Sequence, residues 1–340
     1  MVRKKLAALA HGWTDDVATA IGQVKLYPDG FGDFDALQEC VDRVKAYTAA
    51  SAPAPIDIRW HDPPKTDRLD GSLVRRGEFR SPAAALMPEA CATAPVEMRL
   101  PRGSRIADRP PMVLLLAATG EQGFTFRRRT STSLLRRGIG VLMLENPYYG
   151  ARRPAGQMMA VLRTVRDQFA MNTATVDEAR ALLSWLQREG YERIGASGYS
   201  QGGMMAAFAS ALTPFPVAVV PRAAGRAAMP IFTQNALMRR FAWDKLAEPF
   251  GGIEAARRYF ASCLEAVDIG RFPAPRNPKL AIVVGSRHDR FVRPEEVEAL
   301  HRHWDGADLR WVKAGHLTGA VLGAPAHNRA IADAFARFDA

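Results

Sequence analysis

Cysteine is scarce in this sequence of 340 residues: Cys40, Cys91 and Cys263 are its only three, and long stretches of chain separate them. Their spacing fits neither a disulfide framework nor a tetrahedral metal site. A chain that does not depend on disulfides suits a reducing compartment, so we expect a cytoplasmic protein.

Long hydrophobic runs are also missing. No apolar run approaches the ~18 residues that a helix needs to cross a bilayer. The chain starts with a basic head, but the apolar run behind it has only about five residues, fewer than the core of a signal peptide. Hydrophobic residues make up 48% and charged residues 24%, as in an ordinary globular protein. The length is enough for one large core with an extension or insertion.

Lysine is rare as well, with eight residues against 38 arginines, and the formal net charge is +11. Such a balance could attract an anionic partner, namely nucleic acid, a phospholipid surface or an acidic substrate. An alanine- and arginine-rich composition shared by a whole proteome would produce the same charge without a function. Because the arginine doublets are dispersed and no nucleic-acid motif accompanies them, we expect no nucleic-acid partner and keep an anionic membrane surface as an alternative.

The first 60 residues predict an N-terminal helical extension. Apolar residues recur at helical spacing over 17–24 and again over 37–47, the second time after a candidate cap at Asp33 or Asp35. A proline-rich segment then ends the extension. No residue in it forms a recognisable chemical motif.

Residues 61–340 predict one α/β domain. Short apolar runs, typical of buried strands, alternate with helical segments, and this rhythm indicates a mostly parallel central sheet with helices on both faces. The expected central strands are 112–118, 139–144, 193–198, 217–220, 280–285 and 308–312. Two alternating strands, 73–80 and 96–100, precede them, and the expected helices include 126–137, 176–189 and 295–303.

Residues 222–278 interrupt this alternation. The segment is mixed in character, with expected helices over 232–246 and 253–266, and lies between two expected strands. In this architecture such an insertion usually covers the active site, so we expect an inserted helical cap. A packed excursion without a role is the alternative.

A nucleophile is indicated by Gly198-Tyr-Ser-Gln-Gly202, which has the form Gly-x-Ser-x-Gly. The serine of such a motif projects from a sharp strand-to-helix turn, where a side chain at either flanking position would clash with the backbone. Glycine removes the clash and tolerates the dihedral angles of the turn. The following helix directs its N–H groups towards developing negative charge.

A serine hydroxyl is a poor nucleophile without a base, and the base needs a carboxylate that orients it. With this serine turn, the chain order is Ser, then Asp or Glu, then His, each after a strand. Asp289 follows the expected strand 280–285, and His316 follows the expected strand 308–312. We therefore expect a catalytic triad of Ser200, Asp289 and His316.

Other histidines remain as alternatives. His288 lies beside the expected carboxylate, and His327, in the last expected helix, is the nearest competitor of His316 as the base. His301 and His303 are two residues apart on a helix and do not face one another, so we expect no metal site there.

The negative charge of a tetrahedral intermediate needs two backbone donors. We expect one to be the N–H of Gln201, directly after the nucleophile. The other should come from the loop Thr119-Gly-Glu121 after the first central strand, where we name Gly120 and Glu121 as candidates. Glycine permits the close backbone approach, but the sequence does not decide which residue donates.

Three further residues are candidates for the substrate site. Arg127 belongs to a run of three arginines near the expected mouth and could bind an anionic head group or phosphate. A solvated or salt-bridged helix face is the alternative. Tyr148 and Tyr149 follow a central strand and either line the pocket wall or pack in the core.

Several segments occur together and resemble one family. They are Phe126-Arg-Arg-Arg-Thr130, Leu144-Glu-Asn-Pro-Tyr-Tyr-Gly150, Trp185-Leu-Gln-Arg-Glu-Gly-Tyr191 and Gly198-Tyr-Ser-Gln-Gly-Gly203, with Asp289 and Gly315-His316 completing the set. From about Leu69 to the C-terminus the chain resembles the alpha/beta-hydrolase domain-containing protein 18 family. The resemblance implies an alpha/beta-hydrolase fold and a serine hydrolase, points towards lipid acyl esters, and implies neither a metal nor an organic cofactor.

Together these observations predict an enzyme that cleaves a carboxylic ester of a small molecule or lipid through an acyl-enzyme intermediate. An acyltransferase or thioesterase that uses the same site is an alternative. A non-catalytic protein with the hydrolase fold that binds anionic lipid is another. No pattern in the sequence predicts the oligomeric state.

Overall fold

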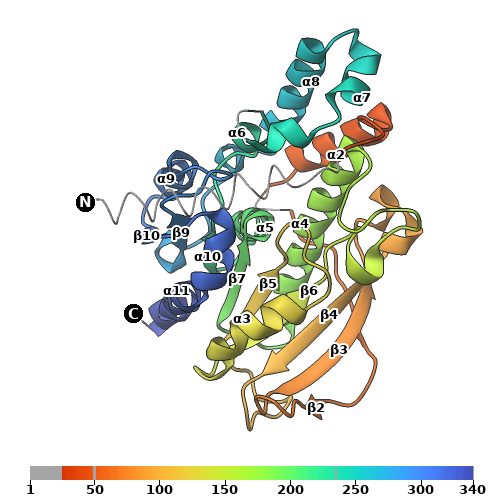
Figure 1. Cartoon of the computed structure of the whole chain (residues 1–340). Coiled ribbons are helices and arrows are strands. Elements are labelled where there is room, and N and C mark those ends of the chain that lie inside the picture. The colour runs from red at the N-terminus through yellow and green to blue at the C-terminus, as the bar shows by residue number, and fades with distance from the viewer. Residues whose placement is uncertain (1–24, 49–50, 234–235, 340) are drawn as a thin grey trace.

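The computed structural model describes residues 25–48, 51–233 and 236–339, so the apolar positions within 17–24 lie outside the described residues. Within the described chain, ten strands form one sheet in the order β1-β3-β4-β6-β5-β7-β8-β9-β10, with β2 pairing with β3 (Figure 1). The strands are β1 (Arg59–Trp60), β2 (Lys65–Thr66), β3 (Leu73–Arg80), β4 (Thr93–Leu100), β5 (Met112–Leu116), β6 (Gly140–Leu144), β7 (Ile194–Tyr199), β8 (Ala218–Arg222), β9 (Ile282–Ser286) and β10 (Asp308–Val312).

The sheet is parallel from β6 to β10 and antiparallel at its other end. Neighbours among β6, β5, β7, β8, β9 and β10 run parallel, whereas β4 pairs antiparallel with both β3 and β6. All residues of β5, β6, β7, β8 and β9 are buried, as expected for parallel strands covered on both faces. The expected mixed α/β fold with a mostly parallel central sheet is confirmed.

Helices cover the two faces of the sheet. On one face, α4 (Val165–Arg188) and α5 (Gln201–Ala211) pack on β5 and β7. On the other face, α3 (Thr125–Leu135) contacts β6, and α11 (Ala324–Ala336) contacts β8 and β9 (Figure 1). Two apolar clusters fill the two interfaces between helices and sheet. The central strands are therefore held rigidly, and their carboxyl ends meet at one edge of the sheet.

Helix α4 is longer than the sequence pattern predicts. The expected helix began at residue 176, but α4 begins at Val165, where the Thr164 hydroxyl accepts a hydrogen bond from the Asp167 N–H at 3.1 Å. Its first turns contain many polar side chains, so the apolar periodicity of the second half is not visible there. One of these side chains, Asn172, accepts a hydrogen bond from Gln201 at the start of α5.

The insertion between β8 and β9 is broken into short helices. The expected helix over 232–246 is replaced by α6 (Met229–Thr233), a 3-10 turn (Ala236–Arg240) and α7 (Trp243–Ala247), and α8 (Ile253–Glu265) follows. Helix α9 (Pro294–His303) lies beyond β9 and packs against it.

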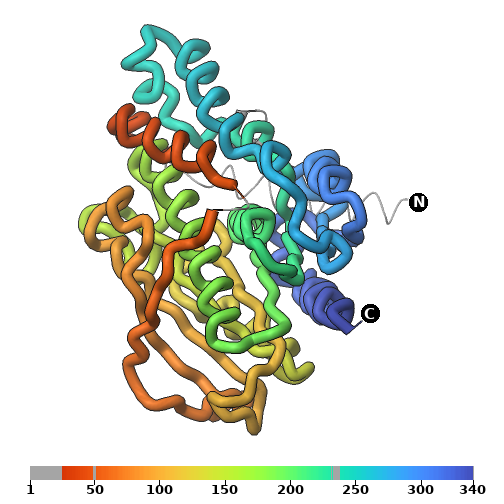
Figure 2. The backbone as a smooth tube through the Cα atoms, turned by 180° about the vertical axis from the view of Figure 1, so that it is seen from behind, coloured from red at the N-terminus to blue at the C-terminus, as the bar shows by residue number. Residues whose placement is uncertain are grey.

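The N-terminal segment packs directly against this insertion, as both views of the chain show (Figures 1 and 2). Helix α2 (Phe34–Lys45) begins after Asp33, whose carboxylate accepts the Ala36 N–H at 3.0 Å. Before it, the ring of Phe31 lies 5.2 Å from that of Tyr259 in α8. Helix α2 also packs on α4, so the N-terminal segment connects that helix with the insertion.

Across the described residues, no helix combines the length and the apolar character that spanning a membrane requires.

Candidate active site

The turn at Ser200 lies between β7 and α5 and is sterically demanding. Ser200 has φ +55° and ψ −118°, a conformation that side-chain-bearing residues rarely adopt. A Cβ on Gly198 would lie 2.2 Å from the backbone of Gly202, and a Cβ on Gly202 would lie 2.5 Å from the carbonyl oxygen of Leu116. Only glycine fits at both positions, as the Gly-x-Ser-x-Gly pattern predicts.

Ser200, His316 and Asp289 lie within hydrogen-bond distance of one another in series. The Oγ of Ser200 is 2.9 Å from Nε2 of His316, and Nδ1 of His316 is 2.7 Å from Oδ2 of Asp289. His316 and Asp289 are buried, with 9% and 5% of their surface exposed, while Ser200 is half-buried. A proton can therefore pass from the serine to an imidazole whose other nitrogen faces a carboxylate.

Backbone groups fix the carboxylate. Oδ1 of Asp289 accepts hydrogen bonds from the N–H groups of Phe291 and Val292 at 2.9 and 2.8 Å, which leaves Oδ2 for the imidazole. Helix α10 (His316–Leu322) starts at the histidine itself, and the Gly315 N–H donates to the Thr318 hydroxyl at 2.9 Å. The base is thus held at the first position of a short helix.

The imidazole within hydrogen-bond distance of Ser200 is that of His316, which the sequence order predicted as the base. His327 lies in α11, only 2% exposed, with its ring 5.5 Å from that of Tyr199. Burial and, secondly, the charge of Arg222 lower the pKa of His327 to about 3, so this imidazole is neutral at physiological pH. The backbone N–H of His288 donates to the Ala314 carbonyl in the loop before the base.

Gln201 is the first residue of α5, so its N–H has no acceptor within that helix and stays a candidate donor at the nucleophile. Glu121 does not supply the other, contrary to our expectation: its N–H closes a turn by donating to the Ala118 carbonyl at 3.1 Å. The Gly120 N–H donates a hydrogen bond to the Tyr149 hydroxyl, which lowers the pKa of that hydroxyl. Burial has the larger, opposite effect and raises this pKa to about 12. Within the described residues, the neighbouring Thr119 N–H has no acceptor, so Thr119 joins the candidates.

The side chain of Gln201 joins the two halves of this region. Its Oε1 accepts the Thr119 hydroxyl at 3.1 Å, and its Nε2 donates to Oδ1 of Asn172 at 2.7 Å. The same Oδ1 accepts Nε2 of Gln168 at 3.1 Å. One amide therefore connects the loop after β5, the nucleophile turn and α4. Sequence reasoning placed Thr119 in the donor loop without a role for its side chain, and it missed Asn172, which belongs to no recognisable motif.

Arg127 is a structural residue, and its assignment to the substrate site is wrong. Its side chain is 3% exposed and forms an ion pair with Glu121 at 2.6 Å. Its Nη1 donates to the carbonyls of Leu115 and Leu144, both at 2.7 Å, and Nη2 donates to the Gly123 carbonyl at 3.1 Å. A guanidinium committed in this way ties the ends of β5 and β6 together and is not available to an anionic head group.

Tyr148 and Tyr149 are core residues, each 1% exposed, so the pocket-wall alternative is wrong for both. The Tyr148 hydroxyl donates to Asp167 in α4 at 3.2 Å. Just before them, Oε1 of Glu145 accepts the Gly123 N–H at 2.8 Å. The distinctive Glu-Asn-Pro-Tyr-Tyr-Gly segment thus supports the loops around the site.

In the described part of the chain, no group of three or more His, Cys, Asp or Glu side chains could hold a metal ion.

Solved structures with a similar fold include several hydrolases. An acetyl xylan esterase from a Paenibacillus species aligns with a TM-score of 0.59 at 15% identity, over 90% of this chain and 96% of that one. Acetyl xylan esterase 1 from a Thermoanaerobacterium species aligns with a TM-score of 0.55 at 13% identity, over 92% and 96%. A puromycin-hydrolyzing peptidase from Mycobacterium tuberculosis reaches 0.54 at 14%, over 79% and 40%. Identities this low show a shared fold and no more.

A match to a protein-family model shows the family to which the chain belongs. The model described as alpha/beta hydrolase domain containing 18 matches residues 24–252 and 248–337, which together span most of the sequence. The matched residues include the serine turn, the buried Glu-Asn-Pro-Tyr-Tyr-Gly segment and the loop that carries His316. The chain belongs to the alpha/beta hydrolase domain containing 18 family.

Proposed function

We propose that this hydrolase is a serine esterase that cleaves carboxylic esters, with lipid acyl esters as its substrate class. The observation that carries the proposal is the series of hydrogen bonds from Ser200 to His316 at 2.9 Å and from His316 to Asp289 at 2.7 Å. A strained serine turn next to a carboxylate-oriented imidazole is the arrangement that makes a hydroxyl nucleophilic.

Acylation begins when Oγ of Ser200 attacks the ester carbonyl carbon while Nε2 of His316 takes the hydroxyl proton. The carbonyl π electrons move to oxygen, and the resulting oxyanion accepts hydrogen bonds from the Gln201 N–H and from the loop that contains Thr119 and Gly120. When the tetrahedral intermediate collapses, the carbon–oxygen bond to the alcohol breaks. His316 gives its proton to the departing alkoxide oxygen, and the acyl group remains on Ser200.

Deacylation repeats these steps with water. His316 removes a proton from the water molecule as its oxygen attacks the acyl carbon. The bond to Oγ then breaks, His316 returns the proton to Ser200, and the carboxylic acid leaves. Asp289 keeps Nδ1 of the imidazole protonated and stabilises the imidazolium throughout.

We propose that the insertion over 222–278 acts as the cap of this site, together with residues 25–48 of the N-terminal extension. The support is the aromatic contact between the two segments, including Tyr27 and Phe241 with ring centroids 5.1 Å apart. A cap of this kind excludes water from the site and shapes the space available to the substrate.

The test combines a fluorophosphonate probe with p-nitrophenyl acetate hydrolysis. We expect wild-type protein to be labelled and active, and Ser200→Ala to lose both properties. Ser210→Ala is the matched control, because Ser210 is a buried serine further along α5. A wild-type protein that neither reacts with the probe nor cleaves the ester would contradict the proposal. Acyl transfer to added glycerol in preference to water would instead identify an acyltransferase.

A further inference from the structure

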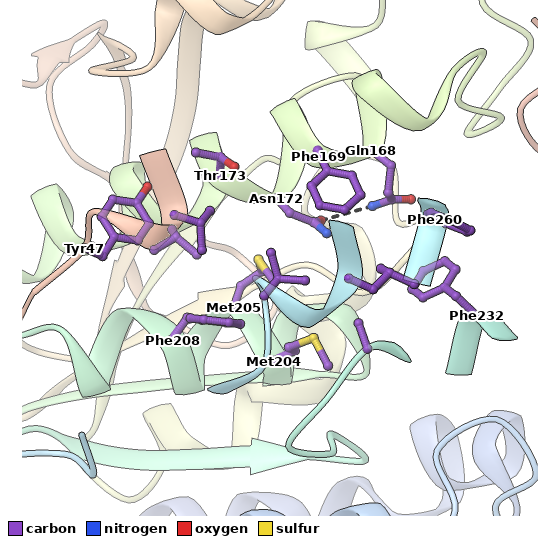
Figure 3. Close-up of a pocket in the computed structure, with 15 residues that line it drawn as sticks. Tyr47, Gln168, Phe169, Asn172, Thr173, Met204, Met205, Phe208, Phe232 and Phe260 are labelled. Carbon is purple, nitrogen blue, oxygen red and sulfur yellow. Dashed lines mark hydrogen bonds between the residues drawn. The ribbon is translucent and has the colours of Figure 1, made fainter. Parts of the chain in front are cut away.

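A pocket of about 540 Å³, its mouth included, lies between α2, α4, α5 and α8, on the same face of the sheet as the nucleophile helix. Figure 3 shows Tyr47 and Phe208 at one end, Phe232 and Phe260 at the other, and Asn172 with Met204 between them. The remaining lining residues are mostly aliphatic or aromatic.

Three of the polar side chains in the lining, Tyr47, Gln168 and Asn172, form hydrogen bonds within the protein. The Tyr47 hydroxyl donates to Asp177 at 2.8 Å, and Gln168 donates to Asn172 at 3.1 Å (Figure 3). No Lys, Arg, Asp or Glu lines the pocket as the structure describes it. A charged or strongly polar ligand would lose its hydration there without gaining partners, whereas an aliphatic chain would not. The lining therefore favours a hydrocarbon group as its ligand.

The pocket adjoins the nucleophile. Asn172, which lines it, accepts a hydrogen bond at 2.7 Å from the side chain of Gln201, the residue after Ser200. Met204, also in the lining, lies one helical turn beyond the nucleophile, and its N–H donates to the Ser200 carbonyl at 3.0 Å. The lining thus begins one helical turn beyond Ser200 along α5, and it includes a direct hydrogen-bond partner of Gln201.

We infer that this pocket binds the acyl chain of the ester substrate, with the carbonyl at Ser200 and an unbranched aliphatic tail between α4 and α5. The inference rests on the proposed function, and it specifies the acyl half of the substrate. The methionines Met204 and Met205 suit such a tail because their flexible side chains adapt to its bends. The cap helices α6 and α8 contribute Phe232 and Phe260 to the same wall.

The first experiment measures kcat/KM for p-nitrophenyl acetate, butyrate, octanoate and decanoate. Each buried methylene raises kcat/KM by up to about fourfold, so we expect the decanoate-to-acetate ratio to exceed about tenfold in the wild type. Thr173→Phe fills the Tyr47 end of the pocket and should lower that ratio at least about tenfold. Phe208→Leu enlarges the same end and should move the preferred chain to greater length.

Phe335→Leu is the matched control. Phe335 is as buried as Phe208 but lies on the opposite face of the sheet, so its truncation should leave the chain-length profile as in wild type. Opposite shifts from Thr173→Phe and Phe208→Leu cannot arise from general unfolding. Identical profiles in all four proteins would overturn the inference and leave the esterase proposal intact.

A second experiment does not depend on catalysis. Sodium decanoate is titrated calorimetrically into Ser200→Ala protein and into the Ser200→Ala/Thr173→Phe double variant. We expect binding to the first and at least about tenfold weaker binding to the second. Equal binding to both would overturn the inference, whereas absent hydrolysis with pocket-dependent decanoate binding would refute only the proposed function.

Discussion

The hydroxyl of Tyr199 donates a hydrogen bond to the backbone carbonyl of His316, although 117 residues separate the two in the chain. The tyrosine precedes the nucleophile directly, and its ring lies 5.4 Å from the imidazole. Tyr199, the last residue of β7, therefore holds the backbone of His316 in place. The next residue, Ser200, is the candidate nucleophile, so two adjacent residues fix the position of nucleophile and base.

Removing this hydroxyl should impair the proposed reaction without abolishing it. In Tyr199→Phe the His316 carbonyl loses a buried donor, which costs about 1 kcal/mol and loosens the first turn of α10. We expect kcat for p-nitrophenyl esters to fall about three- to tenfold while KM changes little, as steady-state kinetics would measure. Tyr191→Phe makes the same change at a buried tyrosine near Met98 and should keep the wild-type kcat. Equal kcat in both variants would show that the Tyr199 contact does not position the base.

Much of the sheet is readable from the sequence because parallel strands buried on both faces must be continuously apolar. The predicted strands 73–80 and 308–312 coincide with β3 and β10, and the others differ by a few residues at their ends. The two-residue strands β1 and β2 are too short to produce any pattern. The first turns of α4 escaped prediction because their polar side chains resemble a solvated surface.

The candidate site is readable in part. Ser200, Asp289 and His316 were named from the order of motifs after strands, and the structure brings them within hydrogen-bond distance; their catalytic role stays a prediction. The assignment of Arg127 to the substrate site is wrong because exposed and buried arginines produce the same sequence pattern. Its structural role depends on the carbonyls of two strand ends that only the folded sheet brings together. The hydrogen bond between Gln201 and Asn172 likewise exists only after α4 and α5 pack.

The buried position of Arg127 predicts a loss of stability rather than of substrate affinity. Arg127→Met leaves Glu121 and several carbonyls buried without their donor, which should lower the free energy of unfolding by about 3–5 kcal/mol. Urea denaturation followed by circular dichroism measures the change. Arg129→Met, an exposed arginine of the same helix, should stay within about 0.5 kcal/mol of wild type. Wild-type stability in Arg127→Met, combined with a higher KM for anionic esters only, would restore the arginine to the substrate site.

Gly150, at the end of the Glu-Asn-Pro-Tyr-Tyr-Gly segment, should not tolerate alanine. A Cβ there would lie 1.7 Å from Oε1 of Glu145, the carboxylate that also accepts the Gly123 N–H. Gly150→Ala must therefore displace a buried carboxylate, and we expect little folded protein. Gly156→Ala is the control, because Gly156 also has a positive φ, +79°, but no atom lies within 4 Å of the added Cβ. It should cost only about 1–2 kcal/mol in urea denaturation, and a similar cost for both variants would show that Glu145 moves freely.

His327 should make the fold sensitive to acid. Burial and the charge of Arg222 lower its pKa from the ordinary 6.5 to about 3 in the native protein. Between these two pH values the unfolded chain binds a proton that the native protein does not, so the free energy of unfolding falls as the pH falls, by up to about 1.4 kcal/mol per pH unit. Above pH 6.5 both states are neutral at this residue and its contribution is constant.

Replacing this histidine should therefore flatten the pH dependence of stability. We expect the loss of unfolding free energy between pH 7 and pH 5 to be smaller by roughly 2 kcal/mol in His327→Gln than in wild type, as urea denaturation at the two pH values would measure. His61→Asn changes an exposed histidine at the antiparallel end of the sheet and is the matched control, which should keep the wild-type slope. If His327→Gln keeps the wild-type slope too, the buried imidazole must accept a proton in the native protein, and another group must account for the acid sensitivity.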